Sequence, residues 1–209
     1  MTYDFYGQLK KRMPSAAVDI LRMAHVHVFG LGGLGSQAAT LLVRCGVGHL
    51  TLIDGDRVDG TNLHRQQYTI ADIGNDKTEA LAAHLRAVHP DVRLHLRTAF
   101  FDAASLSTVL AGATHLIEAV DDARLKADLL TYAMKHRITV ASGNGMAGLG
   151  SVCTLRVRYL NERTVLCGDE QSDVATAGAL AAGRVSVCAG MQAHEMIRMI
   201  LREKGLSYE

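Results

Sequence analysis

Residues 30–77 of this 209-residue chain hold the glycines and polar side chains best suited to chemistry. A short apolar run is followed by Gly-Leu-Gly-Gly-Leu-Gly, in which the glycines are Gly30, Gly32, Gly33 and Gly35. Glycines between a strand and a helix let the backbone approach a phosphate, which the free N–H groups and positive dipole of the helix then bind. The sequence therefore predicts a nucleotide site at these four glycines.

The polar residues that follow decide which nucleotide is expected. Asp54 closes the next apolar run 19 positions after Gly35, and at this spacing an acidic residue bonds a ribose hydroxyl in NAD sites. A triphosphate under attack instead needs positive charge where negative charge moves, and Arg65 and Lys77 could supply it. The glycine turn alone leaves NAD and ATP open.

The whole segment resembles the ThiF/MoeB/HesA superfamily, the bacterial relatives of ubiquitin-activating enzymes. The superfamily pattern includes GxGGLG, GVGxLxLxDxDxV, NLxRQ and a later IGxxK, and all four pieces occur here in order. The resemblance covers about residues 24–203 and looks most like the short ThiF-type adenylyltransferases. It favours ATP over NAD.

The resemblance implies a reaction, a substrate and a cofactor. The expected activity is adenylation, with MgATP and release of pyrophosphate, of the C-terminal glycine of a small ubiquitin-like sulfur carrier protein ending in Gly-Gly. A ThiS-like carrier of thiamine thiazole biosynthesis is the first expectation. The substrate carboxylate is the nucleophile, so the enzyme would contribute positioning and charge stabilisation.

The resemblance also implies a role for individual residues. Asp54 would bond the ribose hydroxyls, and Arg65 and Lys77 would offset charge on the α-phosphate and the leaving pyrophosphate. Asp56 and Asp59 either join the site or support its loop. The full nucleotide-binding set is Gly30, Gly32, Gly33, Gly35, Asp54, Asp56, Asn62, Arg65, Gln66 and Lys77.

Two further residues are implied as catalytic. Asp121, in Glu-Ala-Val-Asp-Asp after a later apolar run, matches the aspartate with which the family binds Mg²⁺, and carboxylate oxygens suit that ion. Asp122 is expected to cap the next helix. Arg12 is the candidate for an arginine that relatives insert from the paired subunit, which implies a homodimer.

The cysteines depart from the pattern of several relatives. Cys45, Cys153, Cys167 and Cys188 form no C-x-x-C pair, so we expect no structural zinc, and they are expected to be reduced thiols. No cysteine lies within residues 168–183, where relatives carry a persulfide or thioester cysteine. Cys167 borders that segment and is either reactive or, more simply, the small residue that ends a strand.

Alternatives from several classes remain. Within the superfamily they are activation of a molybdopterin (MoaD-like) carrier and adenylation like that of tRNA threonylcarbamoyladenosine dehydratase. Outside it they are an NAD-dependent oxidoreductase and a non-catalytic module that only docks a carrier. Lys and Arg number 22 against 21 Asp and Glu, which argues against a nucleic-acid partner. No signal peptide or membrane-spanning run is evident, so a cytoplasmic protein without a membrane contact is expected.

The elements that must position these residues alternate as in a doubly wound, Rossmann-like α/β fold. One domain is expected over 1–209, with an N-terminal helix in 1–23, a nucleotide-binding core in 24–150 and a C-terminal part in 151–209. Strands are predicted over 25–29, 49–53, 92–98, 115–119 and 139–142, and helices over 5–22 (with Pro14 as a break), 34–45, 77–88 (capped by Asp76), 103–110 and 123–136. The mostly parallel sheet is extended by an antiparallel hairpin of 151–159 and 164–166, and then follow a mobile crossover loop over 168–183 and a helix over 186–204.

Overall fold

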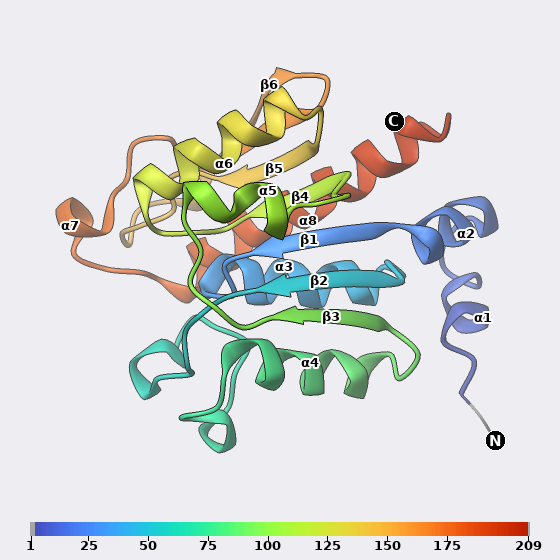
Figure 1. The fold of residues 1–209 in the computed structure, drawn as a ribbon, viewed down its shortest axis with the longest axis horizontal. Helices are drawn as coiled ribbons and strands as arrows, with labels where there is room; N and C mark the ends of the chain where they lie inside the picture. Colours follow the sequence, from blue (N-terminus) through green and yellow to red (C-terminus); the bar gives the residue numbers. More distant parts are fainter. Residues whose placement is uncertain (1–2, 209) are drawn as a thin grey trace.

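The computed structural model describes residues 3–208, which form one seven-stranded sheet with helices on both faces (Figure 1). The strand order is β3-β2-β1-β4-β5-β7-β6, and only β6 and β7 pair antiparallel. This confirms the predicted fold class, including the hairpin that extends the sheet. The strands are β1 (His25–Phe29), β2 (His49–Ile53), β3 (Arg93–Arg97), β4 (His115–Glu118), β5 (Thr139–Gly143), β6 (Arg156–Asn161) and β7 (Thr164–Gly168).

Two hydrophobic cores lie on opposite faces of the sheet. Helices α3, α4 and α8 cover one face, where Val26 and Val28 of β1 are buried, and α5 and α6 cover part of the other, where Phe29 is buried. Parallel strands need cover on both faces because neither face is polar enough for water. The α-helices are α1 (Phe5–Leu9), α2 (Ser15–Met23), α3 (Gly33–Arg44), α4 (Lys77–Val88), α5 (Leu106–Val109), α6 (Ala123–Lys135), α7 (Val174–Ala177) and α8 (Ala182–Glu203).

The strand order reverses its direction of growth between β1 and β4. Strands β2 and β3 lie on one side of β1, and the chain then crosses to the other side of β1, where β4 and β5 lie. In open α/β sheets the crevice at such a reversal, beyond the carboxyl ends of the strands, is where ligands bind. The glycine turn follows β1 and Asp121 follows β4, so both flank this crevice.

The predicted break at Pro14 is confirmed, whereas the last helix begins earlier than predicted. The N-terminal helix breaks at Pro14, which precedes α2 as its N-cap, since proline has no N–H to donate within a helix. The last helix begins at Ala182 rather than 186, although Gly183 disfavours helix. The buried side chain of Arg184 fixes this first turn.

The loops also contain more structure than their composition indicated. The first predicted hairpin strand starts only at Arg156, after a 3-10 turn (Val152–Thr154), and the crossover segment contains the short helix α7. Asp76 occupies the N-cap position of α4, but its carboxylate pairs with Arg57 at 3.3 Å instead of capping the helix. Asp122 does cap α6, by accepting Leu125 N at 2.6 Å. Within residues 3–208, no helix is both long and apolar enough to cross a membrane.

One face of β1 and its neighbours carries a row of imidazoles. The His25 ring lies 4.7 Å from that of His27, 6.1 Å from that of His49 and 5.8 Å from that of His95, measured between centroids. His27 is only 5% exposed, and its Nδ1 has no hydrogen-bond partner. Burial, and then the charges of the neighbouring imidazoles, lower the pKa of His27 from 6.5 to about 4.

Acidification is therefore expected to destabilise the fold through His27. Between pH 6.5 and about 4 the unfolded chain binds this proton and the folded chain does not, so the free energy of unfolding falls as the pH drops through that window. The difference in pKa corresponds to roughly 3 kcal/mol. His27→Gln should flatten the pH dependence of urea unfolding between pH 7 and 4 by about this amount. His194→Gln, on an exposed position of α8, is the control and should leave the slope unchanged.

Candidate functional site

Two of the four glycines are required by the packing of the turn itself. Gly30 has φ +87°, and a Cβ on it would lie 2.6 Å from the carbonyl oxygen of Ala119. A Cβ on Gly35 would lie 1.8 Å from the carbonyl oxygen of Gly30. At Gly32, by contrast, the nearest atom to such a Cβ is Gln66 Nε2 at 3.8 Å. The turn is thus closed toward the sheet and open at Gly32, where a ligand would approach.

Gly35→Ala is expected to disrupt the turn, because its methyl group would overlap the Gly30 carbonyl. Urea unfolding should show a lower free energy of unfolding, and calorimetric titration should show loss of ATP binding. Gly190→Ala is the matched control, since that position lies inside α8 with nothing within 4 Å of the added methyl. It should stabilise the protein by about 0.5–1 kcal/mol. ATP binding by Gly35→Ala at the wild-type affinity would contradict this account.

The open side of the turn offers unpaired donors and acceptors. The first hydrogen bond of α3 runs from Ser36 N to the oxygen of its N-cap Gly32 at 3.1 Å, so the N–H groups of residues 33–35 precede the helical ladder. Gln66 is buried beside Gly32, and its Oε1 has no hydrogen-bond partner. Buried polar atoms are normally paired. The arrangement fits a phosphate-bearing ligand at the N-terminus of α3.

Asp54 ties the ends of β1 and β2 together. Its Oδ2 accepts Leu31 N at 2.6 Å and its Oδ1 accepts Asp56 N at 2.8 Å. Burial raises the pKa of Asp54, while the nearby Lys77 and the two N–H donors oppose that rise. Each carboxylate oxygen has a second lone pair, so the predicted bond to a ribose hydroxyl stays compatible with these contacts.

Lys77 is fixed at the start of α4 with its charge toward this crevice. Its Nζ lies 2.6 Å from Asp56 Oδ2 and 3.9 Å from Asp54 Oδ1, and the residue is 5% exposed. Tyr68 braces the same turn, since its hydroxyl lies 2.9 Å from the carbonyl oxygen of Leu31 and 3.4 Å from that of Lys77. Asp56 thus supports Lys77 in the structure, and its part in nucleotide binding stays a prediction.

The segment that carries Asn62, Arg65 and Gln66 is one helical turn folded against α3. The carbonyl oxygen of Asn62 accepts both Arg65 N and Gln66 N at 3.1 Å. Gln37 of α3 donates its Nε2 to the carbonyl oxygen of Arg65 at 2.9 Å. Arg65 Cγ lies 3.5 Å from the Cβ position of Gly33, which brings Arg65 to the glycine turn. Its guanidinium has a single carbonyl contact, to Thr61 at 3.3 Å.

Asp121 is exposed directly beyond β4, on the far side of the crevice. Within residues 3–208, no group of three or more His, Cys, Asp or Glu side chains is arranged to hold a metal ion. Mg²⁺ is usually held by only one or two carboxylates together with substrate phosphates and water. A single carboxylate at this position therefore fits Mg²⁺ that arrives with a nucleotide.

Arg12 does not reach the site of its own chain. It follows α1 at the amino ends of the strands, whereas the glycine turn lies at their carboxyl ends (Figure 1). Gly46 and Gly48, which precede β2, contact the N-terminal helices through Leu9 and the carbonyl of Arg22. Any role of Arg12 in catalysis therefore requires a second copy of the chain.

The crossover segment passes beside His64, the residue that precedes Arg65. The oxygen of Leu180 lies 3.1 Å from Nε2 of His64, and Gly148 N donates to the carbonyl oxygen of Ala179 at 2.8 Å. Arg184, 4% exposed, holds the other end through Asp169 Oδ2 at 2.7 Å and the carbonyl of Ser151. The segment is therefore anchored over the crevice at two points.

The cysteines beside this segment are unsuited to nucleophilic attack. Cys167 and Cys188 are buried, and Cys188 Sγ donates to the carbonyl oxygen of Cys167 at 3.1 Å. Burial raises the pKa of both thiols, that of Cys188 to about 12. The packing role predicted for Cys167 is the one that the structure supports.

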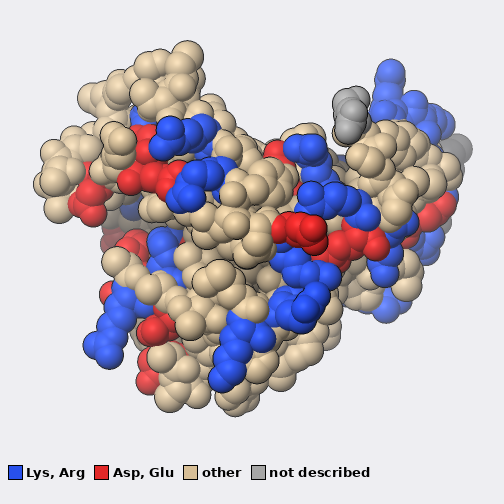
Figure 2. All heavy atoms as spheres, turned by 90° about the horizontal axis from the view of Figure 1, so that it is seen from above, with Lys and Arg blue, Asp and Glu red and all other residues tan. Residues whose placement is uncertain are grey.

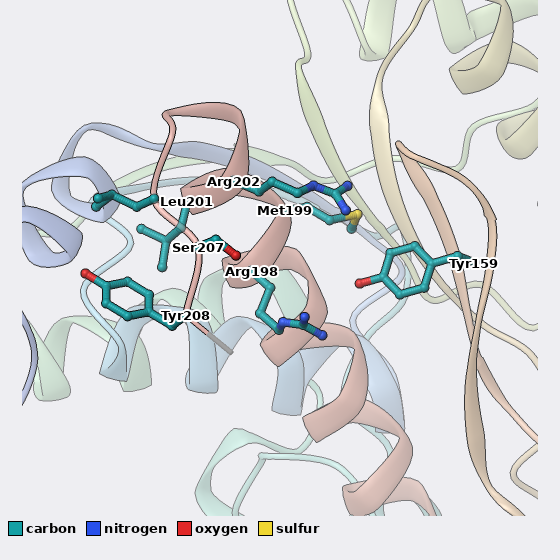
Figure 3. Close-up of a pocket in the computed structure, with 8 residues that line it drawn as sticks. Tyr159, Arg198, Met199, Leu201, Arg202, Ser207 and Tyr208 are labelled. Carbon is teal, nitrogen blue, oxygen red and sulfur yellow. The ribbon is translucent and has the colours of Figure 1, made fainter.

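A small cavity elsewhere does not compete with this site. It lies between β6, the carboxyl half of α8 and the C-terminal residues, and Tyr159, Arg198 and Tyr208 are among the residues that line it (Figure 3). Its volume is about 40 Å³. That is room for a few water molecules and far too little for a nucleotide.

Four contributors to this region carried no signal in the sequence. Tyr68, Glu118, Lys126 and Arg184 are polar side chains that bond buried atoms around the crevice. Tyr68 and Lys126 lie in mixed polar segments, whereas Glu118 and Arg184 lie in apolar or Ala- and Gly-rich segments, so no common local pattern marks the four. Only the polar residues Glu118 and Lys126, eight positions apart at a strand-to-helix junction, could have indicated an ion pair.

Comparison with known proteins adds sequence relatives and shared folds. The model of the ThiF family matches residues 6–209. The tRNA threonylcarbamoyladenosine dehydratases of Haemophilus influenzae and Escherichia coli are 35% and 32% identical to this chain, over 75% and 68% of its length. The matches cover only 61% and 54% of those two relatives. The molybdopterin-synthase adenylyltransferase of Salmonella typhimurium is 28% identical over 95% of this chain and 77% of its own length.

The fold is shared with solved structures. The crystal structure of E. coli tRNA N6-threonylcarbamoyladenosine dehydratase in complex with ATP matches with a TM-score of 0.86. The match covers 96% of this chain and 95% of that chain at 24% identity. This likeness establishes a common architecture for the described sheet and helices.

Proposed function

This chain belongs to the ThiF family, and from that premise we propose that it uses ATP to adenylate a substrate carboxylate, releasing pyrophosphate. The observation that carries the proposal is that two cations flank an open glycine turn at the N-terminus of α3. Lys77 lies beside the Asp54 carboxylate that accepts Leu31 N, and Arg65 packs against Gly33. A nucleotide cofactor of redox chemistry needs no such cations, whereas a transferred phosphoryl group does.

The proposed step needs no nucleophilic side chain. A carboxylate oxygen of the substrate attacks the α-phosphorus of ATP, the bond from that phosphorus to the bridging oxygen breaks, and the electron pair leaves with pyrophosphate. Lys77 and Arg65 stabilise the negative charge that moves onto these oxygens. Mg²⁺ held by Asp121 would neutralise phosphate charge. The buried thiols of Cys167 and Cys188 agree with a reaction in which no cysteine takes part.

The first candidate substrate is the C-terminal glycine of a small ubiquitin-like carrier protein. A tail ending in Gly-Gly has no side chains to obstruct it, so it would suit a path beside the crossover segment, which contacts His64 through Leu180. Molybdopterin-synthase adenylyltransferases, which match almost the whole chain, support a carrier of the molybdopterin type. A thiamine-type carrier remains the alternative within this class.

The second candidate substrate is a small carboxylate attached to tRNA. The two dehydratases, which are at least 32% identical to this chain, support it. Charge argues against it, because Lys and Arg exceed Asp and Glu by one, and Figure 2 shows the two signs interspersed on the face it presents. RNA binding depends on a basic surface that contacts many phosphates.

A homodimer is part of the proposal. Arg12 lies at the wrong end of the sheet to serve its own glycine turn, so it could contribute only to the site of a second copy. Mixing an Arg12→Ala protein with a Lys77→Ala protein tests this directly. Hybrid dimers would regain activity at one site only if Arg12 acts across the interface.

The function is tested by ATP–pyrophosphate exchange with Mg²⁺ in three arms. One arm contains a Gly-Gly carrier of the thiamine or molybdopterin type, one contains threonylcarbamoyl-modified tRNA, and one contains no second substrate. Exchange that depends on a carrier or on the tRNA would support adenylation and identify the substrate class. ATP binding without exchange in any arm would favour a docking module, and fluorescence from bound NADH would favour the oxidoreductase.

A further inference from the structure

The connection between β4 and α6 is closed by an ion pair that the proposed reaction does not use. Glu118, the last residue of β4, is fully buried. Its carboxylate oxygens lie 2.7 and 2.6 Å from Nζ of Lys126, in the first turns of α6. The connection is only four residues long, and the pair joins the strand at its start to the helix at its end.

Both partners of the pair are saturated with hydrogen bonds. Glu118 also accepts Val120 N at 2.8 Å and the hydroxyl of Ser142 at 2.6 Å. Lys126 makes its third bond to the carbonyl oxygen of Gly143 at 2.8 Å. An ammonium group has three donors, so Lys126 has none left for a phosphate. The pair therefore acts on the site through the backbone that it holds.

That backbone touches the glycine turn. Ala119 N donates to the carbonyl oxygen of Phe29 at 2.9 Å, and Ala119 O lies 2.6 Å from the Cβ position of Gly30. The Ala119 side chain also lies 3.3 Å from the Cβ position of Gly35. The Glu118 carboxylate accepts the next amide, Val120 N. If the carboxylate shifted, Ala119 would therefore move relative to the glycine turn.

The same turn carries Asp121. Only Val120 separates the residue packed on the glycine turn from the carboxylate assigned to Mg²⁺. The following residue, Asp122, accepts Lys126 N through its carbonyl at 2.9 Å and closes the connection from the helix side. Three features of the site, namely the glycine turn, Asp121 and the start of α6, thus share one support.

We propose that the buried Glu118–Lys126 pair is a positioning device that sets the glycine turn and Asp121 in one geometry, so that phosphate and Mg²⁺ are bound together. The inference rests on the adenylation proposed above. A buried ion pair is weak evidence for stability, because well-packed apolar residues often serve as well or better. Here the pair organises three groups that an apolar pair could not hold, namely Val120 N–H, the Ser142 hydroxyl and the Gly143 carbonyl.

The test compares four variants: Glu118→Gln, Lys126→Met, the double variant with both changes, and Lys126→Arg. Each single change leaves a buried charge unpaired and is expected to destabilise the fold. The double variant therefore carries the test, and Lys126→Arg is the conservative rescue. Glu203→Gln is the matched control, because Glu203 pairs with His115 and Arg163 at the far end of α8. Each protein is measured for its thermal midpoint, for the Mg²⁺ and ATP concentrations giving half-maximal exchange, and for amide hydrogen exchange without nucleotide.

The double variant should raise the half-saturating Mg²⁺ concentration by roughly 10-fold or more, as loss of a residue that orients a metal ligand does. Its amides in residues 30–35 and 119–122 should exchange faster, and Lys126→Arg should stay near wild type in both measurements. The proposal is overturned if the double variant differs from wild type no more than Glu203→Gln does. The hydrogen-exchange measurement needs no substrate. It therefore tests the positioning role even if the wild-type protein shows no adenylation.

Discussion

Arg65→Ala is expected to slow ATP–pyrophosphate exchange by roughly 10²- to 10³-fold, the loss typical when one group that stabilises transition-state charge is removed. The Arg65 side chain lies with its Cγ 3.5 Å from the Cβ position of Gly33, and its guanidinium has one carbonyl contact, to Thr61 at 3.3 Å. Little of the fold depends on that contact, so the thermal midpoint should stay close to that of wild type. The measurement is exchange of labelled pyrophosphate into ATP at saturating Mg²⁺.

Arg57→Ala is the matched control for this variant. Arg57 lies in the same polar segment, carries the same charge and is paired on the surface with Asp76, with 72% of its side chain exposed. A surface pair of this kind contributes little, so activity and stability should both remain near wild type. If Arg57→Ala and Arg65→Ala slowed exchange equally, the effect would be one of overall charge, and the phosphate role of Arg65 would fail.

Lys77→Ala should lose as much activity but at a larger structural cost. Lys77 is the positive partner of two carboxylates, Asp54 and Asp56, and is 5% exposed. Removing one partner of a fully buried pair costs roughly 3–5 kcal/mol, and the cost here should be smaller because 53% of the Asp56 side chain is exposed. Arg65 is therefore the cleaner probe of the chemistry, since a loss of activity in Lys77→Ala mixes both effects.

The fold and family were predictable because their signals are local. The glycine turn, the apolar runs of five residues and the four spaced motifs each depend on neighbours in the chain, and the seven-stranded sheet and the ThiF match confirm them. The alternation of strands and helices predicts parallel strands joined by right-handed crossovers, without fixing their order in the sheet. The strand order that places the crevice between β1 and β4 was not predicted, because it depends on pairing between strands far apart in the sequence.

The partners of the polar residues were not predictable in this way. Asp76 was expected to cap α4, but Arg57, 19 positions earlier, draws its carboxylate away. Helix α8 begins four residues earlier than predicted because Asp169 and Ser151 bond Arg184. Such pairings join residues far apart in sequence, and hydrophobic periodicity carries no information about them. The roles assigned to the site residues rest on the family resemblance and stay predictions.

Asp121→Ala is expected to reduce exchange on the order of 10²-fold at millimolar Mg²⁺, because the carboxylate assigned to the metal would be lost while the charge on the phosphates remains. A metal-ligand role further predicts partial recovery at higher Mg²⁺ concentration. The thermal midpoint should not fall, since Asp121 is exposed and lies outside β4 and α6. The measurements are ATP–pyrophosphate exchange over a range of Mg²⁺ concentrations and the thermal midpoint of the same variant.

The neighbouring Asp122 provides a control that distinguishes a metal-binding role of Asp121 from a structural one. Asp122 caps α6 through Leu125 N at 2.6 Å, so Asp122→Ala should lower the free energy of unfolding by about 1 kcal/mol. In a protein of this size, that loss lowers the thermal midpoint by roughly 2–4 °C. The two Asp-to-Ala variants should thus differ in effect: Asp121→Ala should lose activity, and Asp122→Ala should lose stability. If both variants lost stability and kept their Mg²⁺ dependence, Asp121 would be a structural residue, and the metal would have to be held by the phosphates alone.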